Sequence, residues 1–222
     1  RPAEIAQMLY FSHPERVLKL RSAALSTLRT YFDGKVSLIM MVMTKKTSQF
    51  QIRRCGSRSQ ETFPILFNAK KTEGNTYLVT SAGPGIGKSF ISANLAVAMA
   101  MTGKRVLLID ADARLGHLQD RFNLPNINGL VDYLVDDTID AANSSYMIQT
   151  TLYENLHFIP RGKGHSHASE LFLNGKMEAL LNFYRQFYDY IIIDTSPVLG
   201  TSDALSIGQL VDSVLFVVRY DV

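Results

Sequence analysis

Residues 82–89 read Ala-Gly-Pro-Gly-Ile-Gly-Lys-Ser. Glycine has no β-carbon, so Gly85 and Gly87 let backbone N–H groups converge closely on an anion at the start of a helix. Lys88 follows at once and can fold over the β and γ phosphates of a nucleotide, while the next hydroxyl, Ser89, can ligate Mg²⁺. The run therefore predicts a loop that binds a nucleoside triphosphate together with Mg²⁺.

The loop departs from the usual pattern G-x-x-x-x-G-K-[ST] at its first position, where Ala82 replaces glycine. Alanine is the smallest possible change, and the neighbouring Gly83 can absorb the turn. A glycine-rich stretch of this kind can be only a turn, but the order of strand, loop, Lys-Ser and helix favours phosphate binding. The predicted nucleotide-binding residues are Gly83, Pro84, Gly85, Ile86, Gly87, Lys88, Ser89 and Phe90.

Three aspartates follow apolar runs of the kind that is buried in a parallel sheet. Asp110 and Asp112 come after residues 106–109, Val-Leu-Leu-Ile, and Asp194 comes after residues 191–193, Ile-Ile-Ile. In a doubly wound sheet, ligands bind outside the carboxyl ends of the strands, so these carboxylates should converge with the loop on one crevice. Each aspartate alone could be a helix N-cap. Together with the loop, the three predict a phosphoryl-transfer site.

The elements that would position these residues alternate between strand and helix. Apolar runs predict strands over 77–81, 105–110, 155–160, 190–194 and 213–219. Helical patterns fall between them, over 88–101, 129–135, 169–186 and 203–210. This alternation predicts an α/β fold with a doubly wound, mostly parallel sheet that is covered on both faces.

Composition limits the class of protein. At 222 residues, with 46% hydrophobic and 19% charged residues, the chain can bury a substantial core, which excludes a wholly disordered protein. The apolar run at 36–43 is much shorter than the roughly 20 residues of a membrane helix. No signal peptide is expected, and the lone Cys55 favours a reducing compartment. The H-x-H pair His165 and His167 is expected in a solvated turn rather than on a metal.

The chain is predicted to divide into residues 1–73, a helical segment with a basic connector, and residues 74–222, a nucleotide-binding domain. One helical pattern spans about 14–34, and residues 35–73 show no clear period, so no structure is predicted there. Residues 44–71 carry seven basic residues and one acid. They read either as a solvated connector or as a contact with anionic lipid or nucleic acid. No nucleic-acid-binding module is present, so nucleic acid is not an expected partner.

Three segments together carry a resemblance to a known family. They are VTSAGPGIGKSFISANLAVAMAMTGKRVLLIDADARLGHLQDRFNL, PRGKGHSHASELF and YDYIIIDTSPVLGTSDA. In order and spacing they resemble the cytoplasmic domain of the bacterial tyrosine autokinases of capsular and exopolysaccharide export. The resemblance covers residues 76–222 and implies a P-loop NTPase fold of the deviant-Walker type.

Position by position, the resemblance implies ATP and Mg²⁺ as cofactors. Lys88 would contact the phosphates, and Ser89, Asp110 and Asp194 would hold the metal, Asp194 through water. Asp110 and Asp112 would be the catalytic carboxylates, and either could accept the tyrosine proton. The nucleophile would be a tyrosine in the tail of a neighbouring protomer, which implies a homo-oligomer. A membrane-bound polysaccharide co-polymerase domain or activator would be a partner at the cytoplasmic face of the bacterial inner membrane.

The sequence also departs from the family. Ser196 stands in the usual Pro-Pro pair, and residues 165–168 replace a Pro-Pro-Asn-Pro turn, changes that should leave ATP binding intact. Ala23 and Ser26 occupy the Glu and first Arg positions of a Glu-x-x-Arg-x-x-Arg assembly helix, which puts ring assembly in doubt. The domain is expected to be truncated at its C-terminus, before a tyrosine-rich tail. Tyr184, Tyr188 and Tyr190 are expected to be packing residues rather than phosphosites.

Two other functions share most of these features. The partition and cell-division positioning ATPases have the same fold and loop, but their loop carries an extra lysine at the position of Gly83. A catalytically degenerate scaffold that binds nucleotide in the export machinery is the second. The five retained residues Lys88, Ser89, Asp110, Asp112 and Asp194 argue against the scaffold.

Overall fold

The computed structural model describes residues 37–44, 50–54, 75–164 and 168–220. The helix expected over 14–34, the assembly-helix positions, Cys55 and the H-x-H pair lie outside these residues. In chain order the elements are β1 (Ser37–Thr44), β2 (Phe50–Arg54), β3 (Asn75–Ser81), α4 (Lys88–Ala100), β4 (Val106–Asp110), η1 (Leu118–Phe122), α5 (Leu130–Val135), η2 (Ser144–Met147), β5 (Gln149–Thr150), β6 (Leu156–Ile159), α6 (Ala168–Leu171), α7 (Lys176–Tyr184), β7 (Tyr190–Asp194), α8 (Asp203–Gly208) and β8 (Ser213–Tyr220).

The described strands form one sheet in the order β2-β1-β8-β3-β7-β4-β6-β5. The six inner strands, β1, β8, β3, β7, β4 and β6, are parallel to one another. The two outer strands, β2 and β5, pair antiparallel with their neighbours. All residues of β3, β4 and β7 are buried, as expected of strands that are covered on both faces. The predicted fold class, a doubly wound and mostly parallel α/β sheet, is confirmed.

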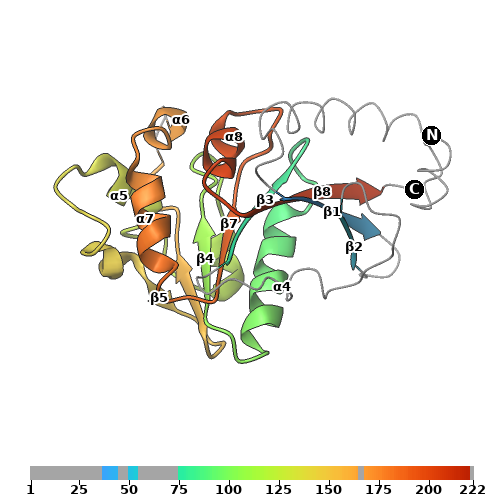
Figure 1. Cartoon of the computed structure of the whole chain (residues 1–222), viewed down its shortest axis with the longest axis horizontal. Helices are drawn as coiled ribbons and strands as arrows, with labels where there is room; N and C mark the ends of the chain where they lie inside the picture. The colour runs from blue at the N-terminus through green and yellow to red at the C-terminus, as the bar shows by residue number, and fades with distance from the viewer. Residues whose placement is uncertain (1–36, 45–49, 55–74, 165–167, 221–222) are drawn as a thin grey trace.

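Helices cover both faces of the sheet, and side chains alternate between two cores. Tyr77, Val79, Leu108 and Ile192 point to the face where α4 and η1 pack. Leu78, Leu107, Ile109 and Ile193 point to the opposite face, where α5, α7 and α8 pack. Figure 1 shows α4 on one side of the strands and α7 and α8 on the other. Among the described residues, no helix has the length and apolar character needed to cross a bilayer.

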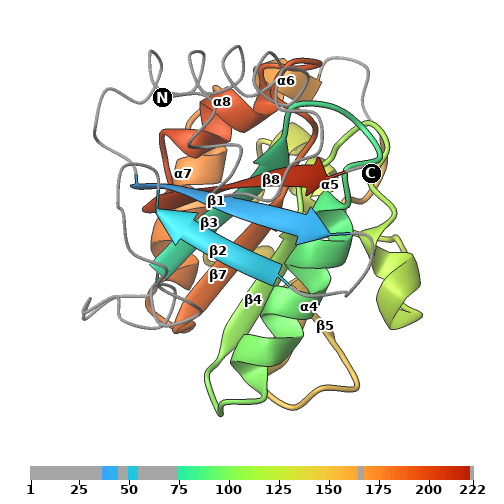
Figure 2. The ribbon, with the colours of Figure 1, turned by 90° about the vertical axis from the view of Figure 1, so that its right-hand side faces the viewer.

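Two features differ from the sequence predictions. No structure was predicted for residues 35–73, which show no clear period, yet β1 pairs with the full length of β8, and β2 pairs with β1 (Figure 2). Pairing with a long apolar strand supplies an order that the local pattern does not reveal. The sheet thus includes strands from before residue 74, while the domain boundary near residue 73 stays a prediction.

The single helix expected over 169–186 is wrong, because the structure has two helices there, α6 and α7. The break lies at Asn174 and Gly175, and Gly175 has φ 79°, a left-handed conformation that favours glycine. The Asn174 side chain accepts a hydrogen bond from the N–H of Lys176, the first residue of α7, at 3.0 Å. An Asn-Gly pair inside a helical pattern was therefore the available sign of the break.

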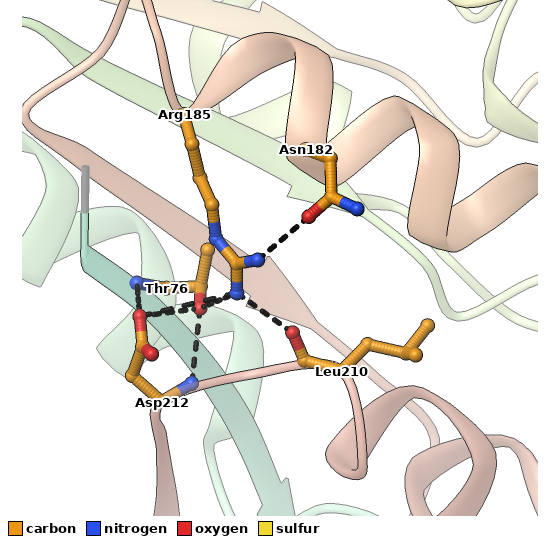
Figure 3. A network of polar contacts seen from close by, with 5 residues as sticks. All are labelled: Thr76, Asn182, Arg185, Leu210 and Asp212. Carbon is orange, nitrogen blue, oxygen red and sulfur yellow. Dashed lines mark hydrogen bonds and ion pairs between the residues drawn. The ribbon is translucent and has the colours of Figure 1, made fainter. Parts of the chain in front are cut away.

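A polar cluster joins α7 to the amino ends of β3 and β8, as Figure 3 shows. The Arg185 guanidinium donates to the Thr76 hydroxyl at 2.9 Å and to the Leu210 carbonyl at 2.8 Å. The Asp212 carboxylate accepts from the Thr76 N–H at 3.0 Å and from the Thr76 hydroxyl at 2.9 Å. These contacts lie at the amino ends of the strands, whereas the predicted phosphate loop follows the carboxyl end of β3. They therefore stabilise the scaffold rather than the site.

Candidate functional site: a phosphate loop beside three carboxylates

The loop between β3 and α4 has the backbone conformation that an anion cradle requires. Gly85 has φ 71° and Gly87 has φ 104°, values that residues with a β-carbon rarely adopt. A β-carbon at Gly83 or Gly85 would meet no atom of the described residues within 4 Å, so this part of the chain leaves open space beside the loop. The first turn of α4 has no acidic residue that would repel an anion from the positive end of the helix.

Lys88 and Ser89 open α4 and lie close to Asp194, which ends β7. The Lys88 side chain is buried. Burial has the largest effect on the pKa of Asp194 and raises it, whereas hydrogen bonds from Ser89 and Ser92 and the charge of Lys88 lower it. The Ser92 hydroxyl donates to Asp194 Oδ1 at 2.8 Å. Burial outweighs these effects and raises the pKa of Asp194 to about 6. The loop and β7 therefore share one buried polar cluster.

Asp110 lies beside Asp194, because the two residues are partners in the parallel pairing of β4 with β7. Its carboxylate accepts hydrogen bonds from the Asp112 N–H and the Leu118 N–H, each at 3.1 Å. Burial, with repulsion from the Asp194 charge as the second cause, raises the pKa of Asp110 to about 8. Two adjacent carboxylates with raised pKa values form a site in which a bound cation would be stabilised.

Asp112 begins a tight turn, residues 112–116, here called the Asp112 turn. Its Oδ1 accepts from the Leu115 N–H at 3.1 Å, and its carbonyl accepts from the Gly116 N–H at 2.8 Å. The side chain is half-buried, whereas Asp110 is fully buried. Asp112 is therefore the carboxylate that lies nearer to solvent at this end of the sheet.

The structure brings five predicted residues together at the carboxyl ends of the central strands, and their roles stay predictions. They are Lys88, Ser89, Asp110, Asp112 and Asp194. The parallel strands β3, β4 and β7 all end there, as Figure 1 shows. The other predicted loop residues differ in environment. Pro84 is exposed, whereas Ile86 and Phe90 pack partly against the core on the α4 face. The Arg121 guanidinium lies 5.4 Å from the centroid of the Phe90 ring.

Sequence reasoning missed several residues of this site. Ser92 lies one turn after Ser89, and that spacing was the only sign that both hydroxyls face one side of α4. Gly116 was not expected either. A β-carbon at Gly116 would lie 2.5 and 2.7 Å from the two carboxylate oxygens of Asp110, so the turn requires a glycine there. No motif in the sequence marks this contact.

The segment after Asp194 is bonded to the end of β3, which leads into the phosphate loop. The Thr195 hydroxyl donates to the Val79 carbonyl at 2.9 Å, and the Thr80 hydroxyl donates to the Ser196 carbonyl at 2.9 Å. Ser196, which departs from the family's Pro-Pro pair, donates from its hydroxyl to Asp203 Oδ2 at 3.1 Å. The hydroxyl therefore connects this segment to α8, a contact that proline cannot make.

The residues present fit Mg²⁺-ATP. Mg²⁺ usually binds to one or two carboxylates and to phosphate oxygens and retains several waters, rather than sitting in a cage of protein ligands. Within the described ranges there is no cluster of three or more His, Cys, Asp or Glu residues able to hold a metal by themselves. The site instead has a hydroxyl and two carboxylates, those of Ser89, Asp110 and Asp194, beside an open glycine loop. This set matches Mg²⁺ bound by one or two carboxylates together with nucleotide phosphates.

Comparisons with known proteins agree with this geometry. A family model described as an AAA domain matches residues 78–221. The tyrosine-protein kinase wzc of Salmonella typhimurium is 35% identical over 156 residues, which are 70% of this chain and 21% of that protein. The kinase domain of the Escherichia coli tyrosine kinase ETK has 35% identity and a TM-score of 0.63, over 70% of this chain and 60% of that chain. These matches confirm the resemblance carried by the three segments.

The comparisons also show how much of each relative this chain covers. The chain spans about a fifth of the length of the curated kinase that it matches. The septum site-determining protein MinD of Pyrococcus horikoshii, complexed with Mg-ADP, is 24% identical with a TM-score of 0.54, over 65% of this chain and 57% of that chain. That likeness is one of fold alone.

Proposed function

Because the chain belongs to the AAA-domain family and resembles the bacterial tyrosine kinases, we propose that it binds Mg²⁺-ATP and transfers the γ-phosphoryl group to tyrosine. The observation that carries this proposal is the meeting of Lys88, Asp110 and Asp194 at one edge of the sheet. By the same resemblance, the activity regulates capsule or exopolysaccharide synthesis and export. The protein would act at the cytoplasmic face of the inner membrane, with a polysaccharide co-polymerase domain or activator as its partner.

The phosphate loop binds the nucleotide in this proposal. N–H groups from Gly85 to Ser89 and the Lys88 ammonium contact the phosphate oxygens. The Ser89 hydroxyl, Asp110 and Asp194 would hold Mg²⁺. When bound, the metal neutralises the charge of the phosphates. Most of the acceleration comes from this positioning and charge neutralisation, and less from proton transfer.

Asp112 accepts the tyrosine proton in this proposal. The tyrosine oxygen forms a bond to the γ phosphorus while the bond from that phosphorus to the β–γ bridging oxygen breaks and ADP leaves. The phenolic proton passes to the Asp112 carboxylate. Asp112 is favoured over Asp110 because it is half-buried, whereas Asp110 is fully buried and accepts two backbone N–H groups. The tyrosine comes from the tail of a neighbouring protomer in a homo-oligomer.

Phosphotyrosine detection on the complete protein tests the proposal. Wild type, Lys88→Met and Lys104→Met are each incubated with Mg²⁺-ATP, and ATP binding is measured in parallel by calorimetry. Lys104 is an exposed lysine beyond the end of α4, so its variant is a matched control for the loss of one charge. We expect phosphotyrosine in wild type and Lys104→Met, and none in Lys88→Met.

Other outcomes separate the alternatives. ATP hydrolysis without phosphotyrosine in folded wild type would contradict a kinase and favour a positioning ATPase. ATP binding with neither reaction would favour a nucleotide-binding scaffold.

A further inference from the structure

We propose that Arg161 is a positioning residue that holds the Asp112 turn beside the carboxyl ends of β4 and β7. Its guanidinium Nη1 donates to the carbonyl oxygen of Arg114, in the middle of that turn, at 3.0 Å. The structural part of this inference stands on the contact itself. Its consequence for catalysis rests on the proposed kinase function.

The sheet places Arg161 beside the turn. Residue Ile159 at the end of β6 pairs with Ile109 near the end of β4, so both strands release their loops at the same edge. The two loops pack together there, since a β-carbon at Gly164 would lie 3.8 Å from the Ala113 carbonyl. Arg161 therefore reaches across a short gap between neighbouring loops and joins them.

The backbone that carries Arg161 is itself anchored. Asn126 makes two hydrogen bonds with Gly162, accepting from its N–H at 2.7 Å and donating to its carbonyl at 3.0 Å. Asp132 Oδ2 accepts from the Lys163 N–H at 3.3 Å, and the Arg161 carbonyl accepts from the Val131 N–H at 2.9 Å. A side chain on so constrained a backbone can fix the position of its partner.

The opposite side of the turn is bonded to Asp110 through the Asp112 N–H. Ala113 is also buried in the core, and Arg161 adds an attachment on the β6 side. A charged donor makes a stronger hydrogen bond than a neutral one, and misplacement of a reacting group by about 1 Å can cost on the order of a hundredfold in rate. Loss of Arg161 should therefore loosen Asp112 without disturbing the phosphate loop on β3 and α4.

The Arg161 guanidinium does not use all of its hydrogen-bond donors. Arg161 Nε is buried and has no hydrogen-bond partner in the part of the chain that the structure describes. A lysine at this position would keep a charged donor for the Arg114 carbonyl and would remove the unpaired N–H. Arg161→Lys is therefore expected to preserve the turn, and Arg161→Met to release it.

Hydrogen exchange on the full chain without nucleotide tests the contact directly. The Leu115 and Gly116 amides, which donate within the turn, should exchange about tenfold faster in Arg161→Met than in wild type. In the variant, opening of the turn no longer has to break the hydrogen bond from Arg161 to the Arg114 carbonyl. Arg161→Lys should match wild type. Lys163→Met, at an exposed neighbouring lysine, is the control for charge loss. Unchanged exchange in Arg161→Met would overturn the proposal. Arg161→Gln replaces Arg161→Met if the latter does not fold.

Kinetics test the consequence for catalysis. With a tyrosine peptide as acceptor, Arg161→Met should lower kcat about tenfold to a hundredfold while the KM for ATP stays unchanged, and Arg161→Lys should restore kcat. Equal kcat in Arg161→Met and wild type, or a parallel loss of ATP affinity, would contradict a positioning role. If wild type forms no phosphotyrosine, the proposed function fails, and the exchange measurement still decides whether Arg161 holds the turn.

Discussion

Replacing Gly116 with alanine should destabilise the protein and impair the site. The new β-carbon would lie 2.5 Å from Asp110 Oδ1, 2.7 Å from Asp110 Oδ2 and 2.7 Å from the Asp112 carbonyl oxygen. Asp110 has no room to retreat, because it is fully buried and its two oxygens accept the N–H groups of Asp112 and Leu118. The substitution must therefore move the carboxylate, the turn, or both.

The magnitude follows from what must shift. Leaving a buried hydrogen-bonding group without its partner costs about 1–3 kcal/mol. Overpacking a closely packed region costs about 1–3 kcal/mol. Because the two effects share the same movement and partly overlap, we expect Gly116→Ala to lower the free energy of unfolding by about 3 kcal/mol. Phosphotyrosine formation should also fall, since the Asp110 carboxylate, the Asp112 turn, or both must move.

The assay is urea denaturation of the nucleotide-free protein, with Gly164→Ala as the matched control. Gly164 lies in the adjacent loop, and a β-carbon there would lie 3.8 Å from the nearest atom among the described residues, an ordinary contact distance. Gly164→Ala should be within about 0.5 kcal/mol of wild type. If Gly116→Ala is as stable and active as Gly164→Ala, the close approach of the turn to Asp110 is wrong.

Three further predictions concern charge, scaffold and tyrosines. Folding raises the pKa of Asp110 and of Asp194 above their unfolded values, so the folded state binds more protons than the unfolded state. The free energy of unfolding without nucleotide should therefore decrease as the pH rises from about 4 to about 8. Urea titrations across this range should show a shallower fall for Asp110→Asn, and a rise in wild-type stability would contradict the shifts. Arg185→Met should lower the free energy of unfolding by about 1–3 kcal/mol and leave Mg²⁺-ATP affinity unchanged by calorimetry, because its partners lie at the opposite edge. A loss of that affinity would argue against a purely structural role. Tyr184 and Tyr188 are buried, so phosphopeptide mapping of the phosphorylated protein should find phosphate on neither.

Much of the central sheet was predictable because its strands are buried on both faces. Runs such as Val-Leu-Leu-Ile before Asp110 and Ile-Ile-Ile before Asp194 are apolar without alternation, and the aspartates follow where parallel strands end. The placing of these two aspartates side by side then follows from the pairing of β4 with β7. Local pattern and topology agree at this edge of the sheet.

The features that escaped prediction depend on contacts distant in sequence. β1 becomes a strand through pairing with β8, which lies at the other end of the chain. Gly116 lies close to Asp110 and to the Asp112 carbonyl, and Arg161 donates to the Arg114 carbonyl, contacts that leave no periodic signal in the sequence. Such residues are identified only when the loops that carry them are seen side by side.

The most direct test of phosphoryl transfer is the fate of ATP labelled in its γ-phosphate. After incubation of the complete wild-type protein with this ATP and Mg²⁺, acid hydrolysis and amino-acid analysis show where the label has gone. Wild type should yield labelled phosphotyrosine, and Lys88→Met should yield none. Label found only as free inorganic phosphate, or only in unreacted ATP, would contradict a tyrosine kinase.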